Sequence, residues 1–287
     1  MSAARVALSV AGSDPSGGAG VQADLKTFGA LGAYGTAVLT ALTAQSTRGV
    51  AGVHPVPADF VRRQLDVLLD DVAVHAVKVG MLGSADVVRA VAGVLRERGA
   101  GPLVLDPVMV ATSGDRLLDA DAVDALRTEL LPLAAVVTPN VPEAAVLLDA
   151  RPARTVQECV DQAEELHRRC GATVLLKGGH LDGGDSVDVL AGAGRTALVG
   201  RPRLATTATH GTGCTLSSAL AALAARAGAP PEPTTAGWLP LVEEARDYLQ
   251  GALAAGAGLG VGSGHGPVDH FHAHPRTPGR TLGGAAS

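Results

Sequence analysis

The segment 208–217, A-T-H-G-T-G-C-T-L-S, places a single cysteine in a glycine-rich turn just before a helical pattern. Glycines let successive backbone N–H groups point inward, and the following helix adds the positive end of its dipole. Gly211, Thr212 and Gly213 could therefore form an anion hole for a phosphoryl group in transfer. The same dipole lowers the pKa of a thiol, so Cys214 could take a proton from a substrate hydroxyl. A helix N-terminal turn around a small buried cysteine is an equally good interpretation of the motif alone.

Other polar residues directly follow apolar runs that are typical of strands. Asp106 stands in V-L-D-P-V and Lys177 in L-L-K-G-G-H, while T-P-N-V-P-E carries Asn140 and Glu143. Carboxylate and amide oxygens suit Mg²⁺, and an ammonium group could neutralise phosphates in transfer. The alternatives are a structural ion pair for Asp106, a solvated strand end for Lys177 and an ordinary acidic helix N-terminus for Glu143.

The loop 13–20, S-D-P-S-G-G-A-G, fits neither G-x-x-x-x-G-K-[ST] nor G-x-G-x-x-G. It predicts a flexible loop over a small ligand, with Asp24 on the first turns of the next helix. A plain strand-to-helix turn is the alternative. Lysine occurs only at positions 26, 78 and 177, and the other basic residues are arginines, so each lysine could have a specific role.

Short apolar runs alternate with helical patterns along the chain. We expect strands at 5–11, 36–45, 75–80, 102–106, 134–138 and 173–177, and helices at 18–31, 58–70, 84–99, 119–131, 142–149, 155–170, 212–227 and 240–257. This repetition predicts a largely parallel sheet with helices on both faces. The segment 185–205 predicts an antiparallel hairpin at the sheet edge.

The predicted fold brings distant residues together. Ligands bind at the carboxyl ends of parallel strands, where Gln45 and Met81 should join the strand-end residues named above. In the helix 18–31, the spacing of Val21, Leu25, Phe28 and Leu31 predicts one buried face. Residues 1–274 are predicted to form one domain, and the tail 275–287 is predicted to be disordered.

Composition excludes several classes of partner. The net charge is −5 without a basic block, which argues against nucleic acid. No uninterrupted apolar run is long enough to span a membrane, and the N-terminus lacks a signal-peptide core. The three cysteines match neither a disulfide framework nor a zinc pattern, so we expect a cytoplasmic protein. The histidines in G-H-G-P-V-D-H-F-H-A-H lack an accompanying cage of Cys or acidic residues, and we assign no metal to them.

The motifs, in this order, resemble the ribokinase-like superfamily, whose marks are N-x-x-E (140–143) and G-x-G-[DC] (211–214). The longer stretches A-G-S-D-P-S-G-G-A-G-V-Q-A-D-L-K-T-F, T-A-Q-S-T-R-G-V, L-D-P-V-M-V-A-T-S-G-D and H-G-T-G-C-T-L-S-S-A are similar to the bacterial hydroxymethylpyrimidine/phosphomethylpyrimidine kinases of thiamine biosynthesis. The resemblance runs from about residue 5 to residue 272 and implies a three-layer α/β/α sandwich.

The resemblance also implies an activity and roles for the residues. ATP would phosphorylate the hydroxymethyl group of 4-amino-5-hydroxymethyl-2-methylpyrimidine, and a second ATP would convert the monophosphate to the pyrophosphate. Cys214 would be the general base behind the anion hole. Mg²⁺ and ATP would be the cofactors, and the protein would be a homodimer. The pyrimidine would be surrounded by Gln45, Gly12, Asp24, Met81 and Val108, and the ATP phosphates and Mg²⁺ would contact Asp106, Asn140, Glu143 and Lys177.

Two alternatives remain open. Cys-type pyridoxal kinases share much of this pattern, but they carry a second cysteine after the D-P-V-M-V-like motif, where this chain reads V-M-V-A-T-S-G. A non-catalytic pyrimidine- or nucleotide-binding protein could also keep the fold. Against it, a competent residue stands at each candidate catalytic position.

Overall fold

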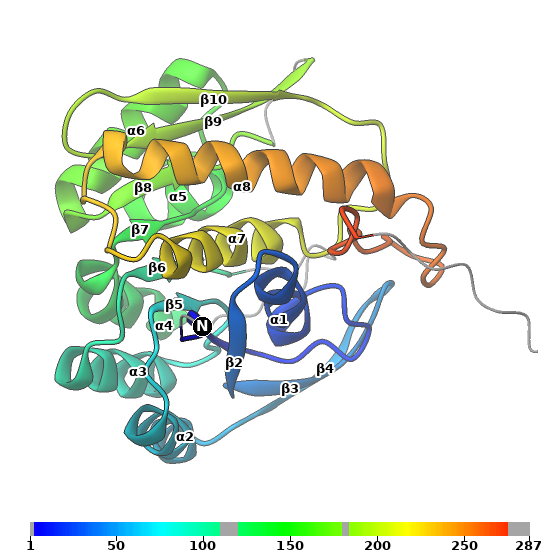
Figure 1. Cartoon of the computed structure of the whole chain (residues 1–287). Helices are drawn as coiled ribbons and strands as arrows, with labels where there is room; N and C mark the ends of the chain where they lie inside the picture. The colour runs from blue at the N-terminus through cyan, green and yellow to red at the C-terminus, as the bar shows by residue number, and fades with distance from the viewer. Residues whose placement is uncertain (1–2, 110–119, 180–183, 275–287) are drawn as a thin grey trace, which may run out of the picture.

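A computed structural model describes residues 3–109, 120–179 and 184–274. Its centre is an eight-stranded sheet with the strand order β10-β9-β8-β7-β6-β5-β1-β2 (Figure 1). The strands are β1 (Val6–Ala11), β2 (Tyr34–Leu39), β5 (Ala76–Val79), β6 (Leu103–Leu105), β7 (Val136–Val137), β8 (Thr173–Leu176), β9 (Asp185–Ala191) and β10 (Ala197–Pro202). The six strands from β2 to β8 pair in parallel, whereas β9 and β10 pair antiparallel at one edge. The predicted parallel sheet and edge hairpin are therefore confirmed.

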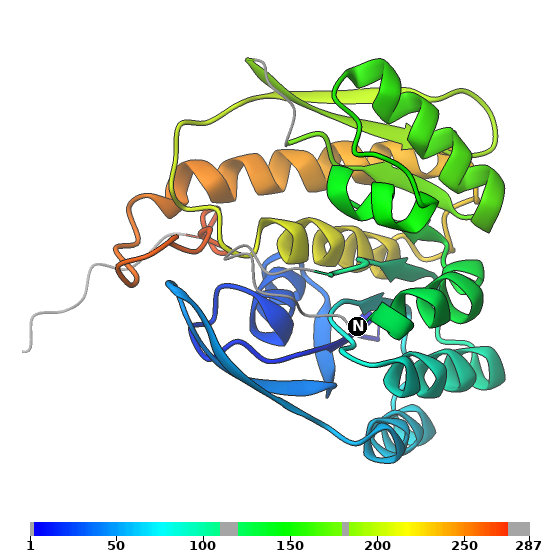
Figure 2. The same ribbon diagram turned by 180° about the vertical axis from the view of Figure 1, so that it is seen from behind.

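Helices cover both faces of the sheet, as the two opposite views show (Figures 1 and 2). One face is covered by α1 (Gly20–Ala30), α7 (Thr212–Arg226) and α8 (Thr235–Gly256), with Phe28 and Trp238 fully buried among alanine and leucine side chains. The opposite face is covered by α2 (Ala58–Asp71), α3 (Ala85–Arg98), α4 (Ala120–Ala125), η1 (Leu126–Leu130), η2 (Leu131–Leu133), α5 (Val141–Leu148) and α6 (Val156–Cys170). The result is the expected three-layer α/β/α sandwich.

The predicted strand 36–45 is two strands in different sheets. The chain leaves β2 at Leu39, and Thr40 donates its hydroxyl to the carbonyl of Met81. It then enters β3 (Ala41–Ser46), which pairs only with β4 (Gly49–Pro55) as a separate two-stranded ribbon. Apolar periodicity continues through the break, so the pattern alone does not mark the change of sheet.

Two helices differ from their predicted form. Helix α8 begins at Thr235 rather than 240, because Thr234 caps it by accepting from the N–H of Gly237, and Pro240 lies inside the helix. In α1 the predicted buried stripe is only partly right, because Leu25 is 37% exposed while Asp24 and Thr27 are buried. The helix thus buries a carboxylate on the face that was expected to be apolar.

Among the described helices, none is long and apolar enough to cross a lipid bilayer.

Candidate active site

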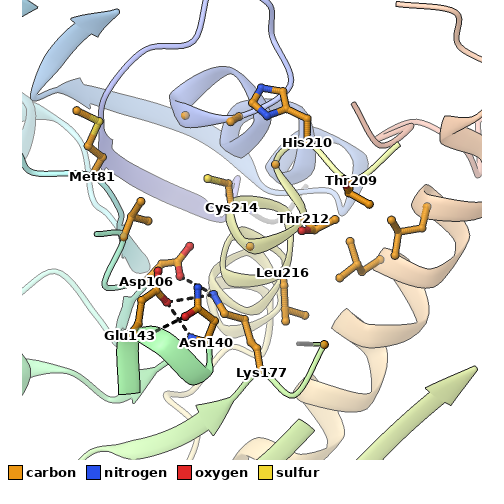
Figure 3. A pocket seen from close by; sticks show the side chains of 18 of the residues that line it. Met81, Asp106, Asn140, Glu143, Lys177, Thr209, His210, Thr212, Cys214 and Leu216 are labelled. Atoms are coloured by element: carbon orange, nitrogen blue, oxygen red, sulfur yellow. Dashed lines mark hydrogen bonds and ion pairs between the residues drawn. The ribbon is translucent and has the colours of Figure 1, made fainter. Parts of the chain in front are cut away.

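The carboxyl ends of the parallel strands open into a cavity of about 700 Å³ (Figure 3). Its wall includes the residues that follow β1, β5, β6, β7 and β8, together with the first turn of α7. The predicted residues on this wall are Gly12, Gln45, Met81, Asp106, Val108, Asn140, Glu143, Lys177, Gly211, Thr212, Gly213 and Cys214. The fold therefore gathers twelve of the thirteen candidates at one place, as the strand-end argument predicts.

The turn that opens α7 has the backbone geometry expected for an anion site. Gly211 is the N-cap residue with φ +79°, and a Cβ there would lie 1.8 Å from the carbonyl oxygen of Gly18. Only glycine can hold this position, because the turn is pressed against the loop 13–20. No side chain caps the helix, so the first-turn N–H groups, which lack intrahelical acceptors, can bind an anion.

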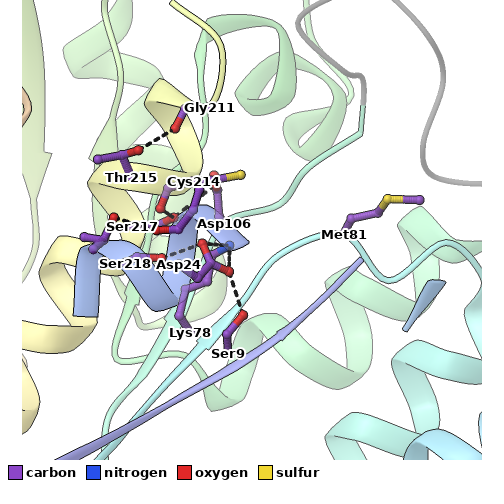
Figure 4. Close-up of polar contacts among 12 residues, drawn as sticks. Ser9, Asp24, Lys78, Met81, Asp106, Gly211, Cys214, Thr215, Ser217 and Ser218 are labelled. Atoms are coloured by element: carbon purple, nitrogen blue, oxygen red, sulfur yellow. Dashed lines mark hydrogen bonds and ion pairs between the residues drawn. The ribbon is translucent and has the colours of Figure 1, made fainter. Parts of the chain in front are cut away.

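The thiol of Cys214 projects from this first turn toward the side of the cavity where Met81 lies, as both close-up views show (Figures 3 and 4). The residue is partly exposed. Burial raises the pKa of the thiol to about 11; Lys78 opposes this rise, and Asp24 and Asp106 add to it. The sequence-based expectation of a lowered pKa is therefore wrong for this structure, because desolvation of the thiol raises its pKa by more than Lys78 lowers it.

Asp106 and Lys177 form an ion pair on the cavity wall. Lys177 Nζ lies 2.9 Å from Asp106 Oδ1, and the hydroxyls of Thr138 and Ser217 also donate to this carboxylate. Burial by itself would raise the pKa of Asp106, but Lys177 and Lys78 lower it, so the carboxylate is ionised. A Cβ at Gly213 would lie 3.3 Å from Lys177 Nζ, which places the backbone of the turn directly beside the pair.

Asn140 and Glu143 form a capping box at the start of α5. Asn140 Oδ1 accepts from the N–H of Glu143, and Glu143 Oε2 accepts from the N–H of Asn140, both at 2.8 Å. The helix N-terminus interpretation is thus confirmed, yet Glu143 also lines the cavity. Burial raises the pKa of Glu143 to about 7; Lys177 opposes this and Asp106 adds to it.

The two carboxyl groups form a donor set that suits a hard cation. Lys177 Nζ lies 2.9 Å from Asp106 Oδ1 and 4.0 Å from Glu143 Oε2, so both carboxyl groups are near one ammonium. The described part of the chain contains no group of three or more His, Cys, Asp or Glu side chains that could hold a metal. A metal at this pair would complete its coordination with phosphate oxygens and water, which is typical of Mg²⁺.

Asp24 is the predicted site residue that does not reach the cavity. Its side chain is fully buried and pairs with Lys78, whose Nζ lies 3.0 and 2.8 Å from the two carboxylate oxygens (Figure 4). The hydroxyls of Ser9 and Ser218 each donate to Asp24 at 2.6 Å. Lys78, in contrast, is among the residues that line the cavity.

Comparisons with known proteins show to which family the chain belongs. The family model described as phosphomethylpyrimidine kinase matches residues 14–269. The chain belongs to the phosphomethylpyrimidine kinase family. The hydroxymethylpyrimidine/phosphomethylpyrimidine kinase of Escherichia coli K12 is 52% identical over 268 residues, which cover 93% of this chain and 97% of that relative. The kinase of the same name from Streptomyces coelicolor is 45% identical, covering 92% and 93% of the two chains.

Solved structures place this phosphomethylpyrimidine kinase family member in a wider fold. Staphylococcus aureus pyridoxal kinase in complex with pyridoxal has a TM-score of 0.84 at 31% identity, over 95% of this chain and 96% of that one. Phosphomethylpyrimidine kinase from Clostridium difficile 630 has a TM-score of 0.73 at 36% identity, over 85% and 97%. Fold similarity extends across both kinds of kinase, so the fold alone does not choose between their substrates.

In this phosphomethylpyrimidine kinase family member, sequence reasoning missed the pair Asp14 and His210. His210 Nε2 lies 2.8 Å from Asp14 Oδ2, and both residues line the cavity. Asp14 also accepts from the backbone N–H groups of Ser16, Gly18 and Ala19. Asp14 therefore bonds to the backbone of the loop 13–20 and to the turn before α7. An aspartate followed by small residues and glycines could have indicated such a loop.

The histidine-rich segment 265–274 contacts the helix turn that follows the anion hole. His270 Nε2 lies 3.2 Å from Thr215 Oγ1, and the Thr215 hydroxyl donates to the carbonyl of Gly211 at 2.8 Å. With that proton used, His270 must donate through Nε2. Burial and Lys26 lower the pKa of His270 to about 4, so the ring is neutral. The segment therefore supports the site, a role that its sequence did not indicate.

The predicted tail and the region after V-M-V, where the second cysteine of pyridoxal kinases would stand, lie outside the described residues.

Proposed function

We propose that the protein uses ATP to phosphorylate 4-amino-5-hydroxymethyl-2-methylpyrimidine and then phosphorylates the monophosphate to the pyrophosphate. The observation that carries this proposal is the position of Cys214 between two chemically different ends of one cavity. Figure 3 shows Met81 on one side of Cys214 and the Asp106–Lys177 pair on another, and Gln45 lines the same cavity. Membership of the phosphomethylpyrimidine kinase family supports the same assignment.

The pyrimidine end offers the groups that a flat aminopyrimidine needs. Gln45 lies on β3, and its side-chain amide lies 3.2 Å from the Thr43 hydroxyl, which donates to the carbonyl of Ser13 at 2.8 Å. The amide has both a donor and an acceptor, which can match the ring nitrogen and the amino group. Gly12 leaves a narrow space, since a Cβ there would lie 3.1 Å from Met81 Sδ. Val108 adds apolar surface on the same wall.

The cavity also offers apolar surface for the nucleotide. Leu204, Leu249 and Leu253 are among its lining residues and can contact the adenine. The phosphates would lie between Lys177 and the first turn of α7, within reach of Asn140. Asp106 and Glu143 would hold Mg²⁺, which neutralises charge on the phosphates when bound.

The residues account for the transfer step as a balanced reaction. Cys214 takes the proton of the substrate hydroxymethyl group, and that oxygen attacks the γ-phosphorus of ATP. The bond from the γ-phosphorus to the bridging oxygen breaks, and ADP leaves. The backbone N–H groups of Thr212 and Gly213 stabilise the charge on the transferring group. In the second step the acceptor is a phosphate oxygen of the monophosphate, and the same turn serves again.

ATP consumption tests this proposal against its two alternatives. We expect turnover with the pyrimidine and with its monophosphate. Turnover on pyridoxal alone would support a pyridoxal kinase. This alternative is tested because the fold is similar to that of the S. aureus pyridoxal kinase. Ligand binding without ATP consumption would support a binding protein. The parallel expectations of a homodimer and a cytoplasmic location are checked by light scattering and by fractionation of cells.

A further inference from the structure

Lys78 is a charged residue in the interior of the sheet. It lies on β5, next to Ser9 on β1 in the parallel register, and its side chain has no exposed surface. An isolated ammonium at such a position carries a large free-energy penalty unless it is paired. Lys78 is one of only three lysines in a chain that otherwise uses arginine. The other two lysines also lie at or near the cavity. Lys26 donates to the carbonyl of Gly17 in the loop 13–20, and Lys177 donates to Asp106 on the cavity wall.

Residues on three other elements fix the position of the ammonium. Asp24 on α1 receives Lys78 with both oxygens, and each oxygen also accepts one hydroxyl, from Ser9 on β1 or Ser218 on α7. The four acceptor positions of the carboxylate are thereby filled. Gly80 leaves room for the ammonium, because a Cβ at that residue would lie 2.7 Å from Lys78 Nζ.

The pair is connected to the proposed base through helix α7. Cys214 and Ser218 are four residues apart, so they share one face of the helix. Ser218 bonds to Asp24, which places the ion pair one turn behind the thiol (Figure 4). The pair is also asymmetric: Lys78 lines the cavity and Asp24 does not. The positive member is therefore the one that faces the site.

We propose that Lys78 is a positioning residue whose fixed charge stabilises the thiolate form of Cys214, the form that accepts the substrate proton, with Asp24 holding the ammonium in place. The inference rests on the proposed role of Cys214 as base. The charged groups that act on the thiol are Lys78 on β5, Asp24 on α1, Asp106 after β6 and Lys177 after β8. Asp24 thus has a role in the site without touching the substrate.

A merely structural pair would leave the titration of Cys214 unchanged, and this difference gives the test. The variant Lys78→Met with Asp24→Asn removes both charges and leaves no unpaired buried charge. The pH dependence of Cys214 alkylation by iodoacetamide is followed on its own peptide by mass spectrometry, with Cys214→Ala as background. The kcat profile against pH is recorded with the pyrimidine and ATP. Lys78 lowers the pKa of the thiol and Asp24 raises it, and the effect of Lys78 is the larger of the two. Removing both charges should therefore move the alkylation midpoint to higher pH and lower the alkylation rate at pH 8.

Arg246 and Asp188 provide a matched control, since they form a second buried ion pair on the same cavity, away from Cys214. Arg246→Met with Asp188→Asn should leave the alkylation midpoint unchanged. If Lys78→Met with Asp24→Asn does not fold, Lys78→Met with Asp24→Leu keeps the packing apolar and gives the same expected shift.

The outcomes separate this inference from the proposed function. An unchanged alkylation midpoint in a folded variant overturns the role of Lys78, whatever Cys214 does in catalysis. A shifted alkylation midpoint together with an equal shift in kcat supports both. The third outcome combines a shifted alkylation midpoint with full turnover in Cys214→Ala. It would support the effect of Lys78 on the thiol and refute the role of Cys214 as base.

Discussion

Asp14 Oδ2 and His210 Nε2 lie 2.8 Å apart, and this contact joins the loop after β1 to the turn that opens α7. The two segments are 196 residues apart in the chain. They meet because the parallel sheet brings the end of β1 beneath the N-terminus of α7. The contact fixes the loop 13–20 and the turn 210–214 relative to each other.

Replacing this carboxylate by an amide tests the contact. Asp14→Asn keeps one acceptor oxygen but loses the second, which bonds His210 and the N–H groups of Gly18 and Ala19. We expect the free energy of unfolding to fall by about 1–3 kcal/mol in urea titrations at pH 7. Ser16→Ala, which removes only one hydroxyl bond to Asp14, is the control and should lie near the lower end of that range. An Asp14→Asn variant as stable as the wild type would contradict a stabilising contact between Asp14 and His210.

The free energy of unfolding at low pH also depends on Asp14. Burial by itself would raise its pKa, but bonds from His210, Ser16 and Ala19 outweigh this and lower the pKa to about 2. Stability from this carboxylate is thus present above the ordinary pKa of 3.8 and is lost as the pH falls toward 2. Asp14→Asn should remove that part of the dependence, measured as unfolding free energy between pH 4 and pH 2.

His270 predicts a pH dependence at milder acidity. Its pKa falls from 6.5 to about 4 because the ring is buried. The unfolded chain therefore binds a proton that the folded chain excludes between these values, so stability present above pH 6.5 is lost as the pH falls through this range. The loss should be on the order of 3 kcal/mol. His270→Asn should flatten this slope, whereas replacing the exposed His265 by alanine should not change it. An equal slope in His270→Asn would contradict the buried neutral histidine.

Two glycines allow a matched comparison of space at the phosphate site and away from it. A Cβ at Gly213 would lie 3.3 Å from Lys177 Nζ and 3.7 Å from Asp106 Oδ2. Gly213→Ala should lower kcat/KM for ATP by on the order of tenfold or more, because the phosphates lose their position. Gly29 also lies in a helix, but a Cβ there meets nothing within 4 Å. Gly29→Ala should keep full activity and stabilise the fold by about 0.5–1 kcal/mol. Equal kinetics in the two variants would refute the placement of the phosphates.

Cys214 makes a prediction about the pH dependence of turnover. Its pKa of about 11 means that the thiolate fraction rises about tenfold per pH unit above neutrality. If the thiolate is the base, kcat should rise with pH from 7 to 9. Cys214→Ala should lower kcat by about 10²–10⁴-fold with little change in ligand binding, and Cys214→Asp should restore part of the turnover with a flatter profile. Full turnover in Cys214→Ala would rule out the base.

The strand-end rule predicted the cluster of site residues because it depends only on sheet topology. The runs before Asp106 and Lys177 are apolar, and a charge directly after them is visible in the sequence. The split of segment 36–45 was missed because apolar residues stand on both sides of Thr40 and no Gly or Pro marks the break. Leu25 was predicted as buried from spacing, yet the helix turns Asp24 inward to meet Lys78. Ion pairs of this kind join strands and helices that are far apart in sequence, so the sequence around one partner does not identify the other.

The raised pKa of Cys214 could not be predicted for a related reason. A helix N-terminus is visible in a sequence, whereas the desolvation of a thiol depends on all the elements around it. The same applies to His270, whose contact with Thr215 depends on how the terminal segment packs against α7.

A time course of products tests the central claim most directly. The purified protein is incubated with 4-amino-5-hydroxymethyl-2-methylpyrimidine, excess ATP and Mg²⁺, and the products are separated by mass and by ³¹P resonance. We predict that the monophosphate forms first and is then converted to the pyrophosphate, with one ADP released at each step. A protein that phosphorylates only pyridoxal, or that binds the pyrimidine without releasing ADP, would contradict the account.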